Sequence, residues 1–89
     1  MSHTHTSHAD VVKRLKRADG HLQKTISMIE DGRPCVDVAQ QLHAVSRAIE
    51  QAKRVFIHDH IDHCLEGSTG AKDDRAQLVA EFREISKYL

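Results

Sequence analysis

One long apolar heptad pattern dominates this sequence. Apolar or small residues recur at alternating steps of three and four, at Cys35, Val38, Leu42, Val45, Ile49, Ala52 and Phe56. This spacing forms a seam along one face of a helix, and such a seam needs a partner helix to cover it. Pro34 is typical of the first position of a helix and Gly67 of its end, so the pattern predicts one continuous helix over residues 34–66.

The remaining sequence predicts two further helices and therefore a small all-α domain over residues 1–89. Gly32 separates the central helix from a first helix over residues 8–31, and a glycine-containing break after residue 66 separates it from a short third helix over residues 71–88. The tight turn makes the first two helices an antiparallel hairpin, and the third helix is expected to complete the bundle. Because Gly20 costs about 1 kcal/mol relative to alanine within a helix, we expect close packing there.

The composition indicates that this domain assembles with copies of itself. Only 39% of the 89 residues are hydrophobic, and the mean hydropathy is −0.51. A chain this small and polar buries a thin core, so oligomerisation is the expected remedy. The sequence contains no apolar run long enough to span a membrane and no secretory signal, so we expect a cytoplasmic protein.

Cys35, His60 and Cys64 are the candidate metal ligands. His60 and Cys64 are four residues apart, so they share one helical face and can bind one metal ion. Cys35 precedes His60 by 25 positions, which is about 37 Å along a continuous helix. One chain cannot join these ligands, whereas an antiparallel second copy can, with two sites related by two-fold symmetry. The alternative is that Cys35 is a small buried hydrophobe and the other two residues are a chance pair.

The first eight residues form a polar tail that is expected to be flexible and is rich in histidine. His3, His5 and His8 lie close to the terminal amine, and nitrogen ligands of this kind suit nickel, copper and cobalt. A solvated tail or the remnant of a purification tag is the alternative. Ser7 and Asp10 have the spacing of a capping box, which predicts the start of the first helix.

The charges are unevenly distributed, although the formal net charge is zero. From Met1 to His58 the sequence has nine Lys and Arg residues and six Asp and Glu residues. After His58 it has four Lys and Arg residues and seven Asp and Glu residues. The basic face of the first helix carries Lys13, Arg14, Lys16 and Arg17. Such a face suits phosphate groups, and the alternative is an ordinary solvated helix surface.

No motif in the sequence indicates an enzyme. A cysteine and a histidine can form a nucleophilic pair, but no glycine-rich loop or oxyanion-hole motif accompanies them here. Two other classes of protein stay open at this point. The chain can be a helical metal buffer that never touches DNA, or a thiol redox switch that uses Cys35 and Cys64 across an interface.

The motifs taken together resemble the CsoR/RcnR family of bacterial metal-sensing or effector-sensing transcriptional repressors. The resemblance rests on the basic segment over residues 14–21, the Pro34-Cys35 helix start, and the His60-xxx-Cys64 pair, and it extends over essentially the whole chain. It implies a three-helix protomer in an antiparallel four-helix-bundle dimer and a dimer-of-dimers homotetramer. It also implies that the metal-free form binds operator DNA through the basic segment, and that metal bound between subunits releases the DNA and derepresses an efflux operon.

The resemblance favours nickel or cobalt as the metal and leaves Cu(I) as the alternative. Copper-sensing members use the trio that Cys35, His60 and Cys64 reproduce, but they commonly have tyrosine where Pro34 stands. Nickel- and cobalt-sensing members add an N-terminal histidine, and His3 occupies the matching position. The resulting set of His3, Cys35, His60 and Cys64 is similar to the nickel/cobalt-responsive branch, DmeR-like or InrS-like.

Overall fold

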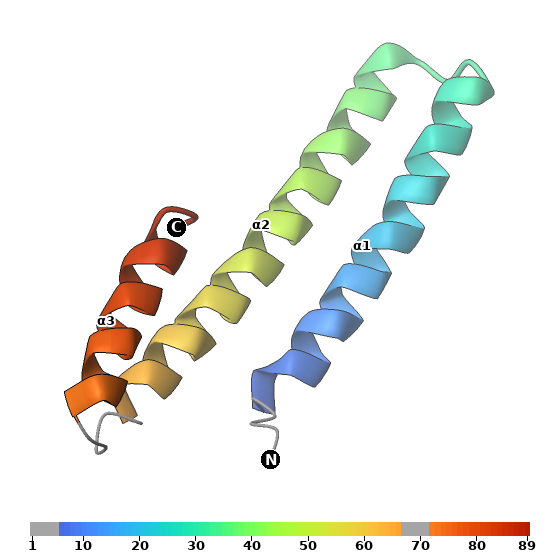
Figure 1. Cartoon of the computed structure of the whole chain (residues 1–89). Helices are drawn as coiled ribbons and strands as arrows, with labels where there is room; N and C mark the ends of the chain where they lie inside the picture. Colours follow the sequence, from blue (N-terminus) through green and yellow to red (C-terminus); the bar gives the residue numbers. More distant parts are fainter. Residues whose placement is uncertain (1–5, 67–71) are drawn as a thin grey trace.

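The computed structural model describes residues 6–66 and 72–89, with side chains for residues 7–62 and 75–89. Over these ranges the secondary structure consists of α1 (Thr6–Glu30), α2 (Cys35–Glu66) and α3 (Lys72–Ser86). The helices α1 and α2 form an antiparallel hairpin, and α3 lies beside the C-terminal part of α2 (Figure 1). The predicted all-α protomer, a helical hairpin with a short third helix, is confirmed. Each observed helix end lies within two residues of its predicted position.

The turn between α1 and α2 is closed by Gly32, whose φ angle is +73°. The Gly32 amide donates to the carbonyl of Ile29 at 3.1 Å, and the Arg33 amide donates to the carbonyl of Met28 at 2.9 Å. These two hydrogen bonds form a Schellman motif, which pairs carbonyl groups that the end of a helix leaves without partners. The positive φ angle is accessible to glycine at little cost, so the local sequence determines where α1 ends.

The two helix starts differ in detail from the predictions. Pro34 lies just before α2 rather than at its first position, and its carbonyl accepts a hydrogen bond from the Val38 amide at 3.1 Å. The capping box predicted for α1 is wrong, because Ser7 lies within the helix. The buried Ser7 hydroxyl has no hydrogen-bond partner in the structure as described, and Asp10 pairs with a later side chain.

A narrow strip of small and medium-sized residues is buried in the hairpin. It consists of Val11, Ala18, Thr25, Val45, Ala52 and Ile57. Ala18 and Ala52 are at most 4% exposed, and their small side chains allow the two helices to approach closely. The Thr25 hydroxyl is fully buried and donates to the His21 carbonyl at 2.8 Å. This hydrogen bond satisfies the buried polar group.

The heptad seam of α2 is divided between two faces. Val45 and Ala52 of one row are buried, whereas Leu42, Ile49 and Phe56 of the other row are 41–45% exposed. The helix α1 contributes further exposed apolar side chains, namely Val12, Leu15, Ile26 and Ile29. The chain measures 59 × 24 × 14 Å, so it is about one helix thick. The predicted need for a partner helix is therefore met by α1 on one side only, and an apolar face remains open.

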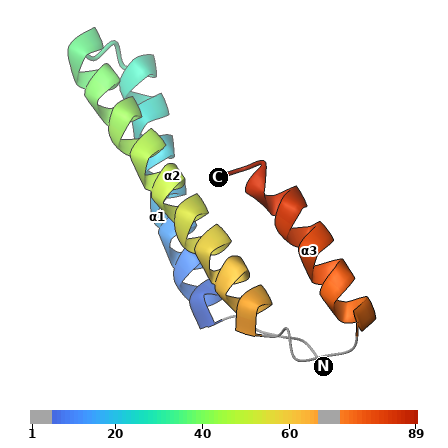
Figure 2. The same cartoon turned by 90° about the vertical axis from the view of Figure 1, so that its left-hand side faces the viewer.

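The helix α3 contacts α2 and does not reach α1 over the described residues. Figure 2 shows it standing apart from the hairpin. Phe82 is 40% exposed and Val79 is 49% exposed, although Leu78 and Ile85 are half-buried. The prediction that the third helix completes the bundle is wrong for the single chain, because over the described residues α3 contacts α2 alone and leaves Val79 and Phe82 exposed. Within the described ranges, none of the helices has the length and apolarity needed to span a membrane.

Substitution by alanine is expected to have opposite effects on the stability of the fold at Gly20 and at Gly32. A Cβ atom placed on Gly20 meets no atom within 4 Å, so the close packing expected there is wrong. We expect Gly20→Ala to stabilise the fold by up to about 1 kcal/mol through higher helix propensity. We expect Gly32→Ala to destabilise it by about 1 kcal/mol or more, because alanine is strained at a positive φ angle. Urea unfolding of both variants measures these changes, and a destabilised Gly20→Ala protein would contradict the open environment of Gly20.

Candidate metal centre and nucleic-acid interface

The predicted metal ligands lie at the two ends of one unbroken helix. Cys35 is a free, exposed thiol at the first residue of α2, and His60 is half-buried six residues before the helix ends. A rise of 1.5 Å per residue places them about 37 Å apart. Cys64 also belongs to α2, but its side chain lies outside the described set, and His3 lies outside the described residues altogether.

No metal centre is assembled by the described side chains of one chain. Within this part of the molecule, no three His, Cys, Asp or Glu residues come close enough together to hold a metal ion. The donor types nevertheless fit the predicted metals, because a thiolate and an imidazole suit Ni(II), Co(II) and Cu(I). Leu42, Ile49 and Phe56 continue the heptad spacing of Cys35, so the open apolar row of α2 begins at Cys35 and ends one turn before His60.

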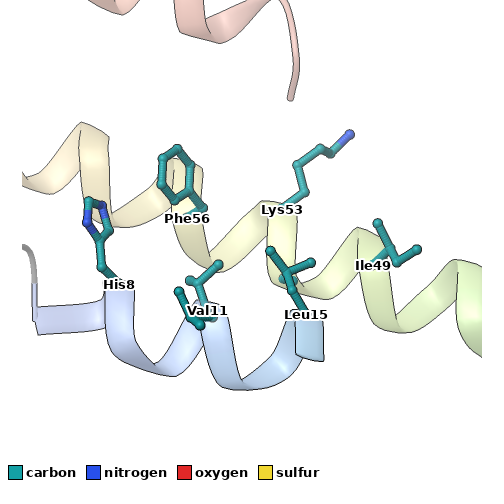
Figure 3. A pocket seen from close by; sticks show the side chains of 8 residues that line it. His8, Val11, Leu15, Ile49, Lys53 and Phe56 are labelled. Carbon is teal, nitrogen blue, oxygen red and sulfur yellow. The ribbon is translucent and has the colours of Figure 1, made fainter. Parts of the chain in front are cut away.

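An apolar groove of about 480 Å³ lies between the first turns of α1 and the C-terminal half of α2. Its lining residues are His8, Val11, Val12, Leu15, Ile49, Ala52, Lys53 and Phe56. Figure 3 shows His8 and Phe56 facing each other at one end of the groove, while Lys53 points away from α1. The two rings are stacked, with centroids 5.2 Å apart and planes inclined by 14°.

The predicted basic face is exposed on α1, but one of its members is already paired. Lys13, Lys16 and Arg17 are exposed, whereas Arg14 is half-buried and its Nε atom donates to Asp10 Oδ2 at 2.9 Å. The sequence analysis gave Asp10 a capping role and missed this pair. The spacing of four residues on one helix was the signal that could have revealed it.

The ion pair changes the acidity of Asp10. The hydrogen bond from Arg14, with the charges of Arg14, Lys13 and Arg17, lowers the pKa of Asp10 below its usual value. Because this pKa is lower in the folded protein, the pair favours folding at any pH above the ordinary carboxyl range. Its contribution is lost as the pH falls through the lowered pKa. Asp10 therefore stays ionised, and Arg14 stays partly neutralised, at neutral pH.

A second hollow, of about 200 Å³, lies between α1 and α2 on the basic side. Arg14, Arg17 and His21 of α1 line it together with Ala48 and Gln51 of α2. The His21 ring nitrogen Nε2 is hydrogen-bonded to the Oε1 atom of Gln41, which links the two helices directly. At 100° per residue, Arg14 and Arg17 fall on the opposite side of the buried strip from Leu15 and Val12. The hairpin therefore has one apolar side and one basic side.

Comparison with known proteins identifies the family. The sequence matches the family described as metal-sensitive transcriptional repressors over residues 7–89. The chain belongs to this family. The predicted membership of the CsoR/RcnR family is confirmed.

Individual relatives in the family are named for two different metals. The copper-sensing transcriptional repressor CsoR of Mycobacterium ulcerans (strain Agy99) is 42% identical over 70 residues, which cover 79% of this chain and 58% of that protein. The copper-sensing transcriptional repressor RicR of Mycobacterium tuberculosis (strain ATCC 25618 / H37Rv) is 32% identical over 90 residues, covering 94% of each chain. The match to CsoR thus spans little more than half of that relative's length.

One similar solved structure is of a protein named for nickel. The nickel-responsive transcriptional regulator InrS superposes with a TM-score of 0.80 at 30% sequence identity, and the match covers 99% of this chain and 98% of that one. The three-helix fold is therefore shared over nearly the full length of both chains. Of the three metals that the sequence analysis weighed, copper and nickel occur in the names of these proteins and cobalt does not.

If the basic face binds DNA, the Asp10–Arg14 pair should weaken that binding, because it engages one of the cations of the face. We expect Asp10→Asn to raise the affinity for duplex DNA several-fold, because it frees Arg14 and removes a negative charge from the face. Asp19→Asn, on the same helix, makes the same change in charge without touching this pair and is the matched control. Fluorescence anisotropy at several salt concentrations measures both variants. Equal effects of the two substitutions would show that the pairing of Arg14 does not matter.

Proposed function

We propose that this chain is the protomer of a cytoplasmic homo-oligomeric repressor that binds operator DNA in its metal-free form. Binding of Ni(II) or Co(II) at sites between chains releases the DNA and derepresses a metal efflux operon. The observation that carries this proposal is the continuity of α2, which holds Cys35 and His60 at opposite ends. Because one rigid helix keeps these donors about 37 Å apart, only a second chain can join them at one metal ion.

The open apolar face supports an antiparallel dimer. The exposed row of α2 leads from Cys35 to Phe56, and the exposed apolar residues of α1 lie beside it. Full burial of one large apolar side chain contributes about 1.5–3 kcal/mol, so covering these half-exposed side chains contributes on the order of 1 kcal/mol each. A second hairpin laid antiparallel on this face completes a four-helix bundle. It also places Cys35 of each chain beside the His60 end of its neighbour.

The second level of assembly in the proposal is a dimer of dimers. In the single chain, α3 leaves Val79 and Phe82 substantially exposed, and Tyr88 and Leu89 follow them at 61% and 64% exposure. In the proposal these side chains, which belong to α3 and the residues that follow it and not to the hairpin, stay available after the first partner has bound. They provide an apolar surface through which two dimers associate into the homotetramer that the family resemblance implies.

The proposed ligand set is Cys35 of one chain with His60 and Cys64 of the other, and His3 as a fourth donor. Two thiolates and two imidazoles provide the four nitrogen and sulfur ligands that Ni(II) accepts in a plane, and Co(II) tolerates the same donors. When bound, the metal supplies a cross-link between the two chains. The positions of two donors in the fold support this assignment: the Cys35 thiol is exposed, and the His60 ring is half-buried.

The proposed DNA contacts are Lys13, Arg14, Lys16 and Arg17. Arg14 and Arg17 lie on the side of the hairpin opposite to its apolar side, so a partner chain on the apolar side leaves them accessible. Cations on a helix surface contact the phosphate backbone and make the affinity strongly dependent on salt. A dimer displays two such faces, which suits an operator with two-fold symmetry.

A copper sensor is the second candidate, and the names of the relatives favour it. The copper-sensing CsoR of M. ulcerans is 42% identical to this chain over the matched region. Two thiolates from Cys35 and Cys64 with the imidazole of His60 suit Cu(I), which prefers soft ligands. This candidate uses the same interface and the same DNA face, and it differs from the first in leaving His3 out of the site.

Mixing two inactive chains tests whether the site lies between chains. We expect Cys35→Ala and His60→Ala each to lose high-affinity Ni(II) and Co(II) binding. A mixed dimer of the two variants retains one site with both donors, since Cys35 comes from one chain and His60 from the other. Random pairing makes half of the dimers mixed, and each mixed dimer has one intact site out of two. Equimolar mixing after partial unfolding should therefore restore thiolate charge-transfer absorption to about one quarter of that of the unaltered protein. No recovery, with dimers verified by sedimentation, would place the site within one chain.

Titration with three metals separates the two candidate sensors. We expect the reduced protein to bind one Ni(II) or Co(II) per chain, with thiolate charge-transfer bands that weaken or shift in His3→Ala. DNA duplexes selected from a random library with metal-free protein should lose affinity about 5- to 150-fold on metal addition. If Cu(I) alone binds tightly and releases the DNA, and His3→Ala makes no difference, the copper sensor is correct.

A further inference from the structure

The contact between His8 and Phe56 connects α1, to which the proposed function assigns DNA binding, with α2, to which it assigns metal binding. His8 lies in the first turns of α1, and its ring stacks on Phe56 of α2 at a centroid distance of 5.2 Å with an interplanar angle of 14°. Both residues line the end of the apolar groove, where Figure 3 shows the two rings facing each other. His8 is half-buried, so its ring is held by the fold rather than carried on a free tail.

On α2, Phe56 lies one turn before His60. Residues four apart occupy the same face of a helix, and each side chain leans toward the N-terminus of its own helix. The His60 side chain therefore leans over the turn that carries Phe56. A change in the position of the His60 ring is transmitted first to that turn, and the His8 ring is stacked on the same turn.

On α1, His8 precedes the basic segment directly. Lys13 lies five residues further along the same helix, about 7.5 Å away along its axis, and Arg17 lies four residues beyond Lys13. An α-helix transmits a displacement of its first turns to the next turns because hydrogen bonds join each turn to the next. The stack thus joins the face of α2 that carries His60 to the first turn of α1, which leads into the proposed DNA contacts.

We propose that His8 is a positioning residue that couples the metal-bearing end of α2 to the basic helix α1 through its stack on Phe56. This inference rests on the proposed function, because it requires a metal at His60 and DNA at α1. The aromatic face of the His8 ring makes the contact, so the stack needs a flat ring and not a metal-binding nitrogen. His8 therefore acts by transmitting a change between the helices and is not a ligand.

Two substitutions of His8 separate stacking from ligation. Phenylalanine keeps a flat ring at this position and removes both ring nitrogens, whereas alanine removes the ring altogether. The quantity to measure is the ratio of the DNA dissociation constants with and without Ni(II), determined by fluorescence anisotropy with the duplex selected by metal-free protein. We expect His8→Ala to reduce this ratio by about fivefold, the size of effect expected for one aromatic contact, and His8→Phe to keep it within about twofold of the unaltered protein.

A double-mutant cycle assigns the effect to the stack. Phe56→Leu keeps an apolar side chain in the groove and removes the ring. We expect His8→Ala to have no further effect on the ratio in the Phe56→Leu background, because the contact has already been lost. Circular dichroism and sedimentation on each variant verify that it is helical and assembled before the ratio is interpreted.

Three outcomes would overturn the inference. A ratio that His8→Ala leaves unchanged would show that the stack does not couple the two sites. A His8→Phe variant as weak as His8→Ala would show that the ring nitrogens, and not the stack, carry the effect. If Ni(II), Co(II) and Cu(I) have no effect on DNA binding by the unaltered protein, the proposed function fails together with this inference. If metal does release DNA from the unaltered protein and either of the first two results is found, only the role of His8 is removed.

Discussion

The continuity of α2 constrains every other feature of this molecule. A helix of 32 residues is about 48 Å long and resists bending, so it fixes the distance between its ends whatever the rest of the chain does. It is the longest element of the fold, and it accounts for most of the 59 Å length of the protomer. Because α1 covers only one of its rows, α2 also leaves half of its heptad seam exposed. The helix therefore creates both the separation of the candidate ligands and the open apolar row on which the proposed second chain would pack.

The two sides of the hairpin show how a chain without net charge can carry two surfaces of different character. The formal charges cancel over the whole sequence, yet Arg14, Arg17 and His21 gather on one side of the buried strip, and the apolar groove opens on the other. Adjacent residues on a helix point 100° apart, so Arg14 and Leu15 serve different sides although they are neighbours in sequence. Asp10 reduces the positive charge of the basic side by pairing with Arg14.

Local chemistry made much of this fold predictable from the sequence. The turn could be predicted because the left-handed conformation of Gly32 and the proline that follows it act within a few residues. The apolar spacing predicted α2 as one helix, and the comparison with known proteins confirmed the family that the motifs indicated. The capping box failed because α1 begins before Ser7, and Asp10 pairs with Arg14, one turn further along the helix.

Features that depend on tertiary structure could not be predicted in the same way. Heptad spacing identifies the apolar positions of α2, but it does not decide that Val45 and Ala52 face α1 while Ile49 and Phe56 stay open. The expected packing at Gly20 followed from a cost in helix propensity, and the structure shows open space there. The stack of His8 on Phe56 joins residues 48 positions apart, and no periodicity in either helix indicates it. The inter-chain ligand set stays a prediction for the related reason that it requires a second copy of the chain.

An inter-chain site also restricts how such a repressor can release DNA. If the ligands come from two chains, metal binds only to the assembled form, so metal binding stabilises the assembly by mass action. DNA that contacts the basic faces of both hairpins favours the same assembled form. Dissociation of the oligomer therefore cannot be the step that weakens DNA binding, since both ligands oppose it. In the proposed function, the reciprocal weakening of metal and DNA must then arise from a change of geometry within the intact assembly, which requires contacts that connect the His60 end of α2 to α1. Among the described side chains, the stack of His8 on Phe56 lies at that connection, at the end of the hairpin where α1 begins.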